Sequence, residues 1–153
     1  MSIPEFKDFR ALCAKGNLIP VYREHLADIE TPVSVASRFA DDRQMFLLES
    51  VEGGTRWGRY SFIGVHPHSR FTATDGKAVL ETAAGKVALD GHGFAALRRV
   101  MEQTVPVALP ELPRFVGGAV GFLGYETVNE FERLPEPRPG LTGPTSCFML
   151  TDT

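Results

Sequence analysis

An acidic residue and a hydroxyl residue end an almost uninterrupted apolar run at positions 44–51. Glu49 and Ser50 directly follow a pair of leucines there. A carboxylate at the end of an apolar strand should not be buried without a partner. Arg59, on the far side of a double-glycine turn, can supply a cation across a hairpin, and Ser50 can cap the turn. On the residues alone, this pairing accounts for the polar group without any ligand.

Histidine and cysteine residues give little sign of catalysis or metal binding. No Gly-x-Ser-x-Gly, Walker or His-Glu-x-x-His pattern occurs, so we predict no catalytic residue. His66 and His68 flank Pro67, but two ligands without a nearby third predict no metal site. Cys13 and Cys147 are far apart and are expected to be buried free thiols. The histidines are isolated or on expected loops: His25, His66, His68 and His92.

Composition predicts a folded, soluble chain. Of the 153 residues, 43% are hydrophobic and 23% are charged, which is typical of globular domains. The net charge of -3, with both signs scattered, argues against nucleic-acid binding. No run approaches the roughly 20 apolar residues of a membrane span, and residues 1–12 do not resemble a signal peptide. We therefore expect a cytoplasmic protein with no membrane partner.

The first third of the chain predicts two helices with an extended segment between them. Apolar residues recur at helical spacing over 4–15, and glycine and asparagine follow as a stop. Residues 18–22 are apolar and are expected to be a strand. Thr31 and Pro32 have the pattern of an N-cap and a first helical position for a helix over 33–39.

The middle of the chain predicts a β meander. Asp75-Gly76 is the dipeptide best suited to a type I′ hairpin, and other glycine turns divide the remaining extended segments. The expected strands are residues 44–51, 57–65, 69–74, 78–82 and 87–89.

The last third predicts a helix, a glycine-rich strand, a short helix and a final strand. The helix is indicated by apolar residues between Phe94 and Met101. Residues 115–122 fit a buried strand that another backbone approaches closely, and a short helix is expected over 125–131. The final run, 147–150, lacks a following turn or partner, so we interpret it as an unfinished strand of a longer protein. These elements predict an α+β fold with a mainly antiparallel β-sheet and flanking helices.

The chain resembles the N-terminal portion of anthranilate synthase component I. The segment that is most similar reads Leu47-Leu-Glu-Ser-Val-Glu-Gly-Gly-Thr-Arg-Trp-Gly-Arg-Tyr-Ser-Phe-Ile-Gly64. A second stretch, Gly117-Gly-Ala-Val-Gly-Phe-Leu-Gly-Tyr-Glu126, is similar to the family's glycine-rich strand. Residues 19–22 and 31–33 also resemble the family, so the likeness covers essentially all of residues 1–153.

The resemblance implies a lyase of tryptophan biosynthesis. Members convert chorismate and ammonia to anthranilate and pyruvate, with ammonia from a glutamine amidotransferase subunit and Mg²⁺ holding the chorismate carboxylate. Their catalytic residues and metal ligands lie in a C-terminal chorismate-binding region. Residues 1–153 are therefore expected to be the tryptophan-binding regulatory part of a larger α/β sandwich, without the catalytic region and without activity or cofactor of their own.

The resemblance also assigns an effector site for tryptophan. Leu48, Glu49 and Ser50 would form its floor and polar edge, and the neighbouring strand would complete it. Such a ligand needs an acceptor for its ammonium, donors for its carboxylate and an apolar slot for its indole. Glu49, Ser50 with Arg59, and the leucines can supply these. The implied tryptophan-binding residues are Leu48, Glu49, Ser50, Arg59, Tyr60 and Ser61.

Two other interpretations stay open. Aminodeoxychorismate synthase component I is a sister enzyme with a similar N-terminal half, although the stretch from Trp57 to Phe62 after Leu-Leu-Glu-Ser favours anthranilate synthase. The chain can alternatively be a stand-alone amino-acid-binding module. Thr55 stands where relatives often carry a charged residue, and this departure is expected to be harmless. Because the C-terminal region completes the pocket in the family, residues 1–153 alone should bind tryptophan weakly or not at all.

Overall fold

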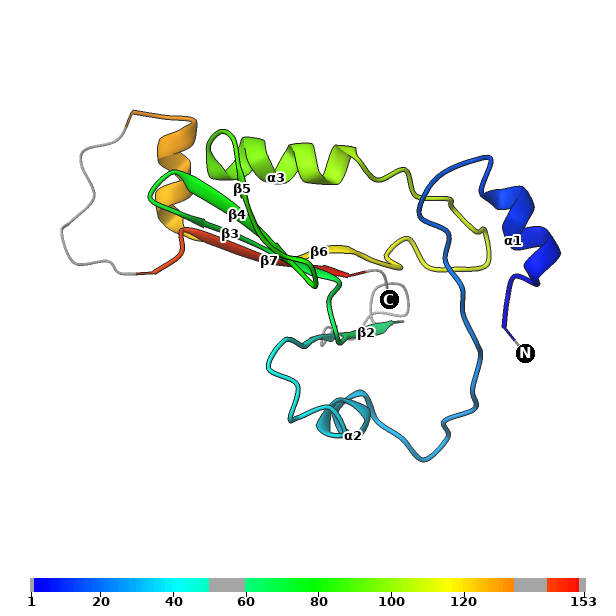
Figure 1. Ribbon diagram of the computed structural model, residues 1–153. Coiled ribbons are helices and arrows are strands. Elements are labelled where there is room, and N and C mark those ends of the chain that lie inside the picture. The colour runs from blue at the N-terminus through cyan, green and yellow to red at the C-terminus, as the bar shows by residue number, and fades with distance from the viewer. Residues whose placement is uncertain (1, 50–59, 134–142, 152–153) are drawn as a thin grey trace.

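Two antiparallel sheets organise the chain in the computed structural model, which describes residues 2–49, 60–133 and 143–151 (Figure 1). The smaller sheet pairs β1 (Phe46–Glu49) with β2 (Ser61–Gly64). The larger has the strand order β5-β4-β3-β7-β6. Its strands are β3 (Ser69–Thr74), β4 (Lys77–Thr82), β5 (Gly85–Leu89), β6 (Gly118–Leu123) and β7 (Ser146–Thr151). The predicted α+β class is confirmed.

The turn between β3 and β4 has the conformation that its sequence predicts. Asp75 and Gly76 have φ angles of 49° and 74°, both in the left-handed region that a type I′ turn requires. The flanking pairs Thr74↔Lys77 and Ala73↔Ala78 are then in register. The meander continues into β5, so the local turn chemistry fixes three neighbouring strands of the larger sheet.

The last strand, β7, lies inside the larger sheet. It pairs antiparallel with β3 on one side and with β6 on the other, and Phe148 stands opposite both Phe71 and Gly121. The strand predicted over 147–150 is confirmed within β7, and both of its partners lie earlier in the sequence. Because its partners come from distant parts of the sequence, the apolar run itself gave no sign of them.

Helix α3 (Gly93–Glu102) covers one face of the larger sheet (Figure 1). Phe71 is completely buried beneath it, which contributes roughly 1.5–3 kcal/mol relative to an exposed ring. The 3₁₀ helix η1 (Tyr125–Glu130) holds the start of α3, because the Glu130 carboxylate accepts a hydrogen bond from the Phe94 amide at 2.9 Å. The core residues are Phe71, Ala73, Ala78, Ala96, Leu97 and Leu150.

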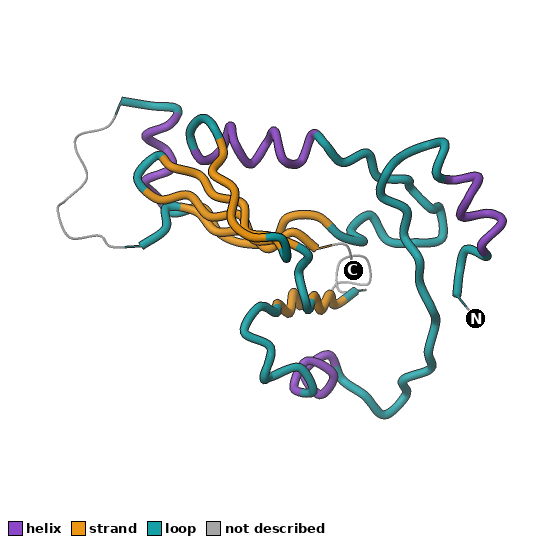
Figure 2. The backbone as a smooth tube through the Cα atoms, in the orientation of Figure 1, coloured by secondary structure: helices purple, strands orange, loops and turns teal. Residues whose placement is uncertain are grey.

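The N-terminal segment departs from prediction. Helix α1 spans only Phe6–Leu12, and no residue in it is buried. Cys13 is an exposed free thiol and Cys147 a half-buried one, so expected burial is wrong for the first. Residues 18–22 do not form a strand; this segment makes isolated bridges to Pro106 and Ile3 (Figure 2). These bridges connect it to distant backbone, which local apolarity does not reveal.

The glycine-rich strand β6 is an edge strand rather than a buried one, and its outer half is exposed. The expected close backbone approach is nevertheless confirmed at Gly121. A Cβ atom there would lie 1.9 Å from the carbonyl oxygen of Cys147 and 2.7 Å from the Cα of Phe148. Glycine is thus required by packing against β7.

Substitution Gly121→Ala should therefore destabilise the protein. The added methyl group must displace backbone of β7, a strain typically worth about 1–3 kcal/mol. Chemical denaturation would measure the loss. Leu123→Ala on the same strand removes a side chain that is 48% exposed and should cost less. Equal stability of Gly121→Ala and the unmodified protein would contradict the packing role.

Candidate functional site

The β1–β2 hairpin carries the predicted effector residues. Its register pairs Phe46 with Gly64, Leu48 with Phe62, and Glu49 with Ser61. The hairpin lies between the larger sheet and helix α2 (Pro32–Ser37), as Figures 1 and 2 show. It is therefore a separate layer, and both of its strands contact α2.

The four described candidates divide between the two faces of the hairpin. Leu48 is opposite Phe62, and the Tyr60 ring lies 6.1 Å from the Phe62 ring, so these residues share one face. Glu49 and Ser61 form the next pair along the ladder, and successive side chains alternate between faces. The apolar and the polar candidates therefore do not converge on a single surface of the strands.

These four residues also lie at the accessible end of the hairpin. Leu48 is 44% and Tyr60 46% exposed, and Glu49 and Ser61 are exposed as well. Ser50 and Arg59 lie outside the described residues, and so does the alternative ion pair between Glu49 and Arg59. The assignment of the six residues to an effector site stays a prediction.

An aromatic cluster closes the other end of the apolar face. Phe115 makes edge contacts with rings from both strands, with Phe62 at 5.2 Å between centroids and an interplanar angle of 85°, and with Phe46 at 6.4 Å and 63°. Phe46 packs over Gly64, where a Cβ atom would lie 2.1 Å from its ring. The sequence alone did not single out Phe115 as a contact of the hairpin, because it was only the first residue of the strand expected over 115–122.

Asp42 fastens the base of the hairpin. Its carboxylate accepts hydrogen bonds from the Gln44 amide at 2.9 Å and from the His66 amide at 3.1 Å. These bonds, with a smaller contribution from the His66 ring, hold the pKa of Asp42 below its usual value. His66 itself has a φ of 51°, so the chain turns sharply where the clamp attaches. His66 thus makes a structural contact at the base of the hairpin.

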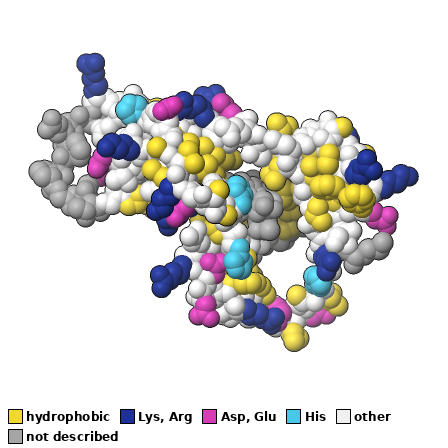
Figure 3. Space-filling model, in the orientation of Figure 1, with side chains coloured by type: hydrophobic (Ala, Val, Ile, Leu, Met, Phe, Trp, Pro, Cys, Tyr) yellow, Lys and Arg dark blue, Asp and Glu magenta, His cyan; other side chains and the backbone are white. Residues whose placement is uncertain are grey.

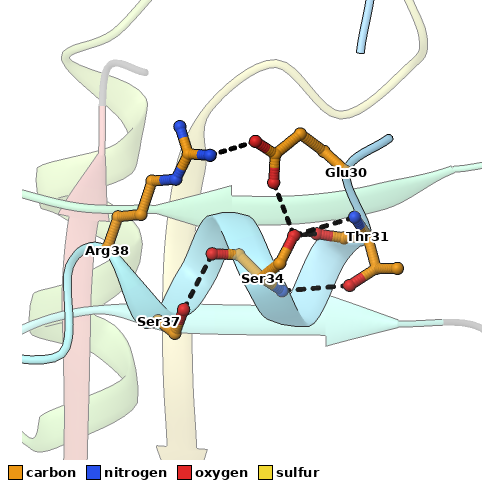
Figure 4. A network of polar contacts seen from close by, with 5 residues as sticks. All are labelled: Glu30, Thr31, Ser34, Ser37 and Arg38. Atoms are coloured by element: carbon orange, nitrogen blue, oxygen red, sulfur yellow. Dashed lines mark hydrogen bonds and ion pairs between the residues drawn. The ribbon is translucent and has the colours of Figure 1, made fainter. Parts of the chain in front are cut away.

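Helix α2 is fixed at its start by a reciprocal capping box, drawn in Figure 4. The Thr31 hydroxyl accepts from the Ser34 amide at 3.0 Å, and the Ser34 hydroxyl accepts from the Thr31 amide at 2.9 Å. The Ser34 hydroxyl also donates to Glu30 at 2.6 Å, and Glu30 pairs with Arg38. The predicted N-cap at Thr31 is confirmed, and it fixes the helix that packs on the hairpin.

Potential metal ligands in the described part of the chain are spread apart. No three His, Cys, Asp or Glu side chains within those residues are grouped closely enough to hold a metal ion. Lys and Arg are interspersed with Asp and Glu on the face in Figure 3. Among the helices of the described segments, none is long and apolar enough to cross a membrane.

Two cavities lie away from the hairpin. One of about 380 Å³ is bounded by Leu18, the end of α3 at Met101 and the buried Ser69. The other, of about 420 Å³, lies over the charged face of β3 and β4 around Arg70 and Glu81. None of the four described candidates lines either cavity.

Comparison with known proteins identifies the class as an anthranilate synthase component 1. The chain is 37% identical over 154 aligned residues to anthranilate synthase component 1 of Acetivibrio thermocellus. It is 40% identical over 144 residues to that of Synechocystis and 42% identical over 132 residues to that of Mycolicibacterium smegmatis. These alignments cover 99%, 91% and 85% of the chain, but only 31%, 28% and 25% of the relatives. No protein-family model matches the chain.

The resemblance drawn from the hairpin and the glycine-rich strand is thus confirmed. Over most of its own length, the chain belongs with the anthranilate synthase component 1 family. It spans less than a third of the length of these three relatives.

The Asp42 clamp predicts a pH-dependent contribution to stability. Because the folded pKa is lowered, the contribution is present at neutral pH and is lost as pH falls through that pKa, below about 4. Asp42→Asn should lower the melting temperature at pH 7, and the difference from the unmodified protein should shrink in acid. Thermal unfolding across pH 3–7 measures this, with exposed Asp41→Asn as control. A pH-independent difference would contradict the clamp's ionised role.

Proposed function

We propose that this chain is the N-terminal, tryptophan-sensing part of an anthranilate synthase component 1. The full-length enzyme would convert chorismate and ammonia to anthranilate and pyruvate. The supporting observation is identity of 37–42% to three such proteins across 85–99% of the chain. The sensing role is supported by the position of Leu48 and Glu49 at the accessible end of an apolar hairpin.

The apolar face of the hairpin suits one side of an indole. Leu48 and Tyr60 are about half exposed there, so a flat apolar ligand can still remove area from water. An indole buries on the order of 150 Å², which at about 25 cal/mol/Å² is roughly 4 kcal/mol before ordering costs. Glu49 ends β1 on the opposite face, so the ligand's ammonium would be bound around the strand end, not on the flat of the hairpin. A second wall from outside these residues is needed for tight binding.

Catalysis would take place outside this chain. Mg²⁺ and chorismate would be bound by the remaining part of the full-length enzyme. A glutamine amidotransferase subunit would supply the ammonia. Tryptophan would inhibit by binding a low-activity arrangement better than the chorismate-competent one, and only this differential affinity shifts the population.

Ser50→Leu in the full-length protein tests the effector site. A bulky apolar side chain in place of the hydroxyl should block binding of the amino acid's polar group. The tryptophan concentration for half-inhibition should rise at least tenfold, equivalent to about 1.4 kcal/mol, while turnover without tryptophan is kept. Steady-state assays of anthranilate formation from chorismate and ammonium measure both.

The matched control is Ser37→Leu, an exposed serine of α2, which should leave inhibition unchanged. Unaltered inhibition in Ser50→Leu would count against the effector site. An aminated product formed without release of pyruvate would instead favour aminodeoxychorismate synthase and overturn the assigned reaction.

A further inference from the structure

We propose that Phe115 is a positioning residue that couples the effector end of the hairpin to the larger sheet. This inference rests on the proposed function, because it concerns how tryptophan bound at the hairpin is sensed elsewhere. Phe115 lies just before β6 in the chain and is half-buried. It therefore connects the β1–β2 hairpin, which would bind the effector, to the larger sheet, which would not.

One ring contacts both strands of the hairpin. Phe62 comes from β2 and Phe46 from β1, and Phe115 presents edge contacts to each, at 5.2 Å and 6.4 Å between centroids. Such aromatic pairs stabilise a packed arrangement beyond the effect of their buried area. A relative shift of the two strands would disturb both contacts, so Phe115 responds to the hairpin as a unit.

The contacts extend from the accessible end of the hairpin to Phe115. Tyr60 lies 6.1 Å from Phe62 between ring centroids, and Leu48 is opposite Phe62 in the ladder. Phe62 in turn contacts Phe115. A ligand seated against Leu48 and Tyr60 would thus be separated from Phe115 by a single side chain.

Phe46 and Gly64 are closely packed at the other end of the cluster. Gly64 is buried under the Phe46 ring, with no room for a Cβ atom. Close-packed side chains transmit a displacement instead of absorbing it. The cluster can therefore couple the position of the hairpin to the backbone before β6.

The receiving strand is placed at an edge of the larger sheet. Among the described strands, β6 pairs only with β7, and Phe122 and Leu123 at its end are 51% and 48% exposed. An edge strand can shift without disrupting the central β3–β7 pair. Effector binding would thus alter the placement of an apolar edge that is accessible to the rest of the full-length enzyme.

Phe115→Leu in the full-length protein tests this coupling. Leucine keeps an apolar side chain but removes the ring edge, so the tryptophan concentration for half-inhibition should rise at least tenfold. The kcat and the KM for chorismate without tryptophan should stay within about twofold. Phe115→Tyr retains the ring and should restore inhibition.

The mutual effect of tryptophan and chorismate on each other's affinity is a second measurement, and a purely structural role of Phe115 would leave it unchanged. In the unmodified protein, chorismate should weaken tryptophan binding by the same factor by which tryptophan weakens chorismate binding. In Phe115→Leu, the Kd for tryptophan measured by calorimetry should be similar with and without chorismate. Phe94→Leu is the matched control. It removes an edge contact, at 5.3 Å and 72°, between α3 and Phe131, the residue after η1, and it should keep the coupling.

The outcomes separate this inference from the proposed function. If tryptophan neither binds nor inhibits the unmodified enzyme, the effector function itself fails. If it inhibits the unmodified and Phe115→Leu proteins equally, only the coupling role is overturned. Loss of tryptophan binding in Phe115→Leu, even without chorismate, would make Phe115 part of the pocket and would also overturn the coupling role. If Phe115→Leu does not fold, Phe46→Leu removes a contact of the same ring, and the same outcomes decide.

Discussion

The pairing of β7 with both β3 and β6 is the interaction on which the larger sheet depends. Phe148 of β7 lies opposite Phe71, the completely buried residue of the core, and opposite Gly121 on the other side. Without β7, the β3–β4–β5 meander would lose one neighbour and β6 would have no described partner. β7 joins β6 to the rest of the sheet, and Phe115 lies just before β6 in the chain. The position from which Phe115 contacts the hairpin therefore depends on β7.

Local chemistry explains which parts of the fold could be predicted. The turn at Asp75-Gly76 and the cap at Thr31 depend on residues within one turn, and both were predicted correctly. The central place of β7 and the bridges of residues 18–22 depend on partners far away in sequence, which periodicity cannot identify. Exposure of Cys13 has the same cause, because no described element packs over α1 to bury its apolar face.

The candidate site was predictable only in part, for a related reason. Resemblance to a family indicated the hairpin segment, and the structure confirms a strand pair there with Leu48 and Glu49 at its end. Successive side chains of a strand point to opposite faces, so Leu48 and Tyr60 lie on one face of the hairpin. Glu49 and Ser61 lie on the other face, and a linear motif does not show this division. Phe115 approaches the hairpin from another part of the chain, so its contacts with Phe46 and Phe62 appear only in three dimensions.

The partial exposure of the hairpin also suits a site at which tryptophan would regulate the enzyme. Leu48 and Tyr60 are 44% and 46% exposed, so the described residues of the hairpin offer a ligand one wall. A ligand held between this wall and a second one would bind tightly only in the arrangement that brings the two walls together, and it would favour that arrangement by its differential affinity. The relatives are more than three times as long as the part that this chain matches, so a second wall can come from the remainder. Under the proposed function, tryptophan would bind tightly only when two regions of the enzyme lie in one particular arrangement, because neither region forms the whole site. The contacts of Phe115 with the hairpin would then ensure that the first wall moves together with the larger sheet.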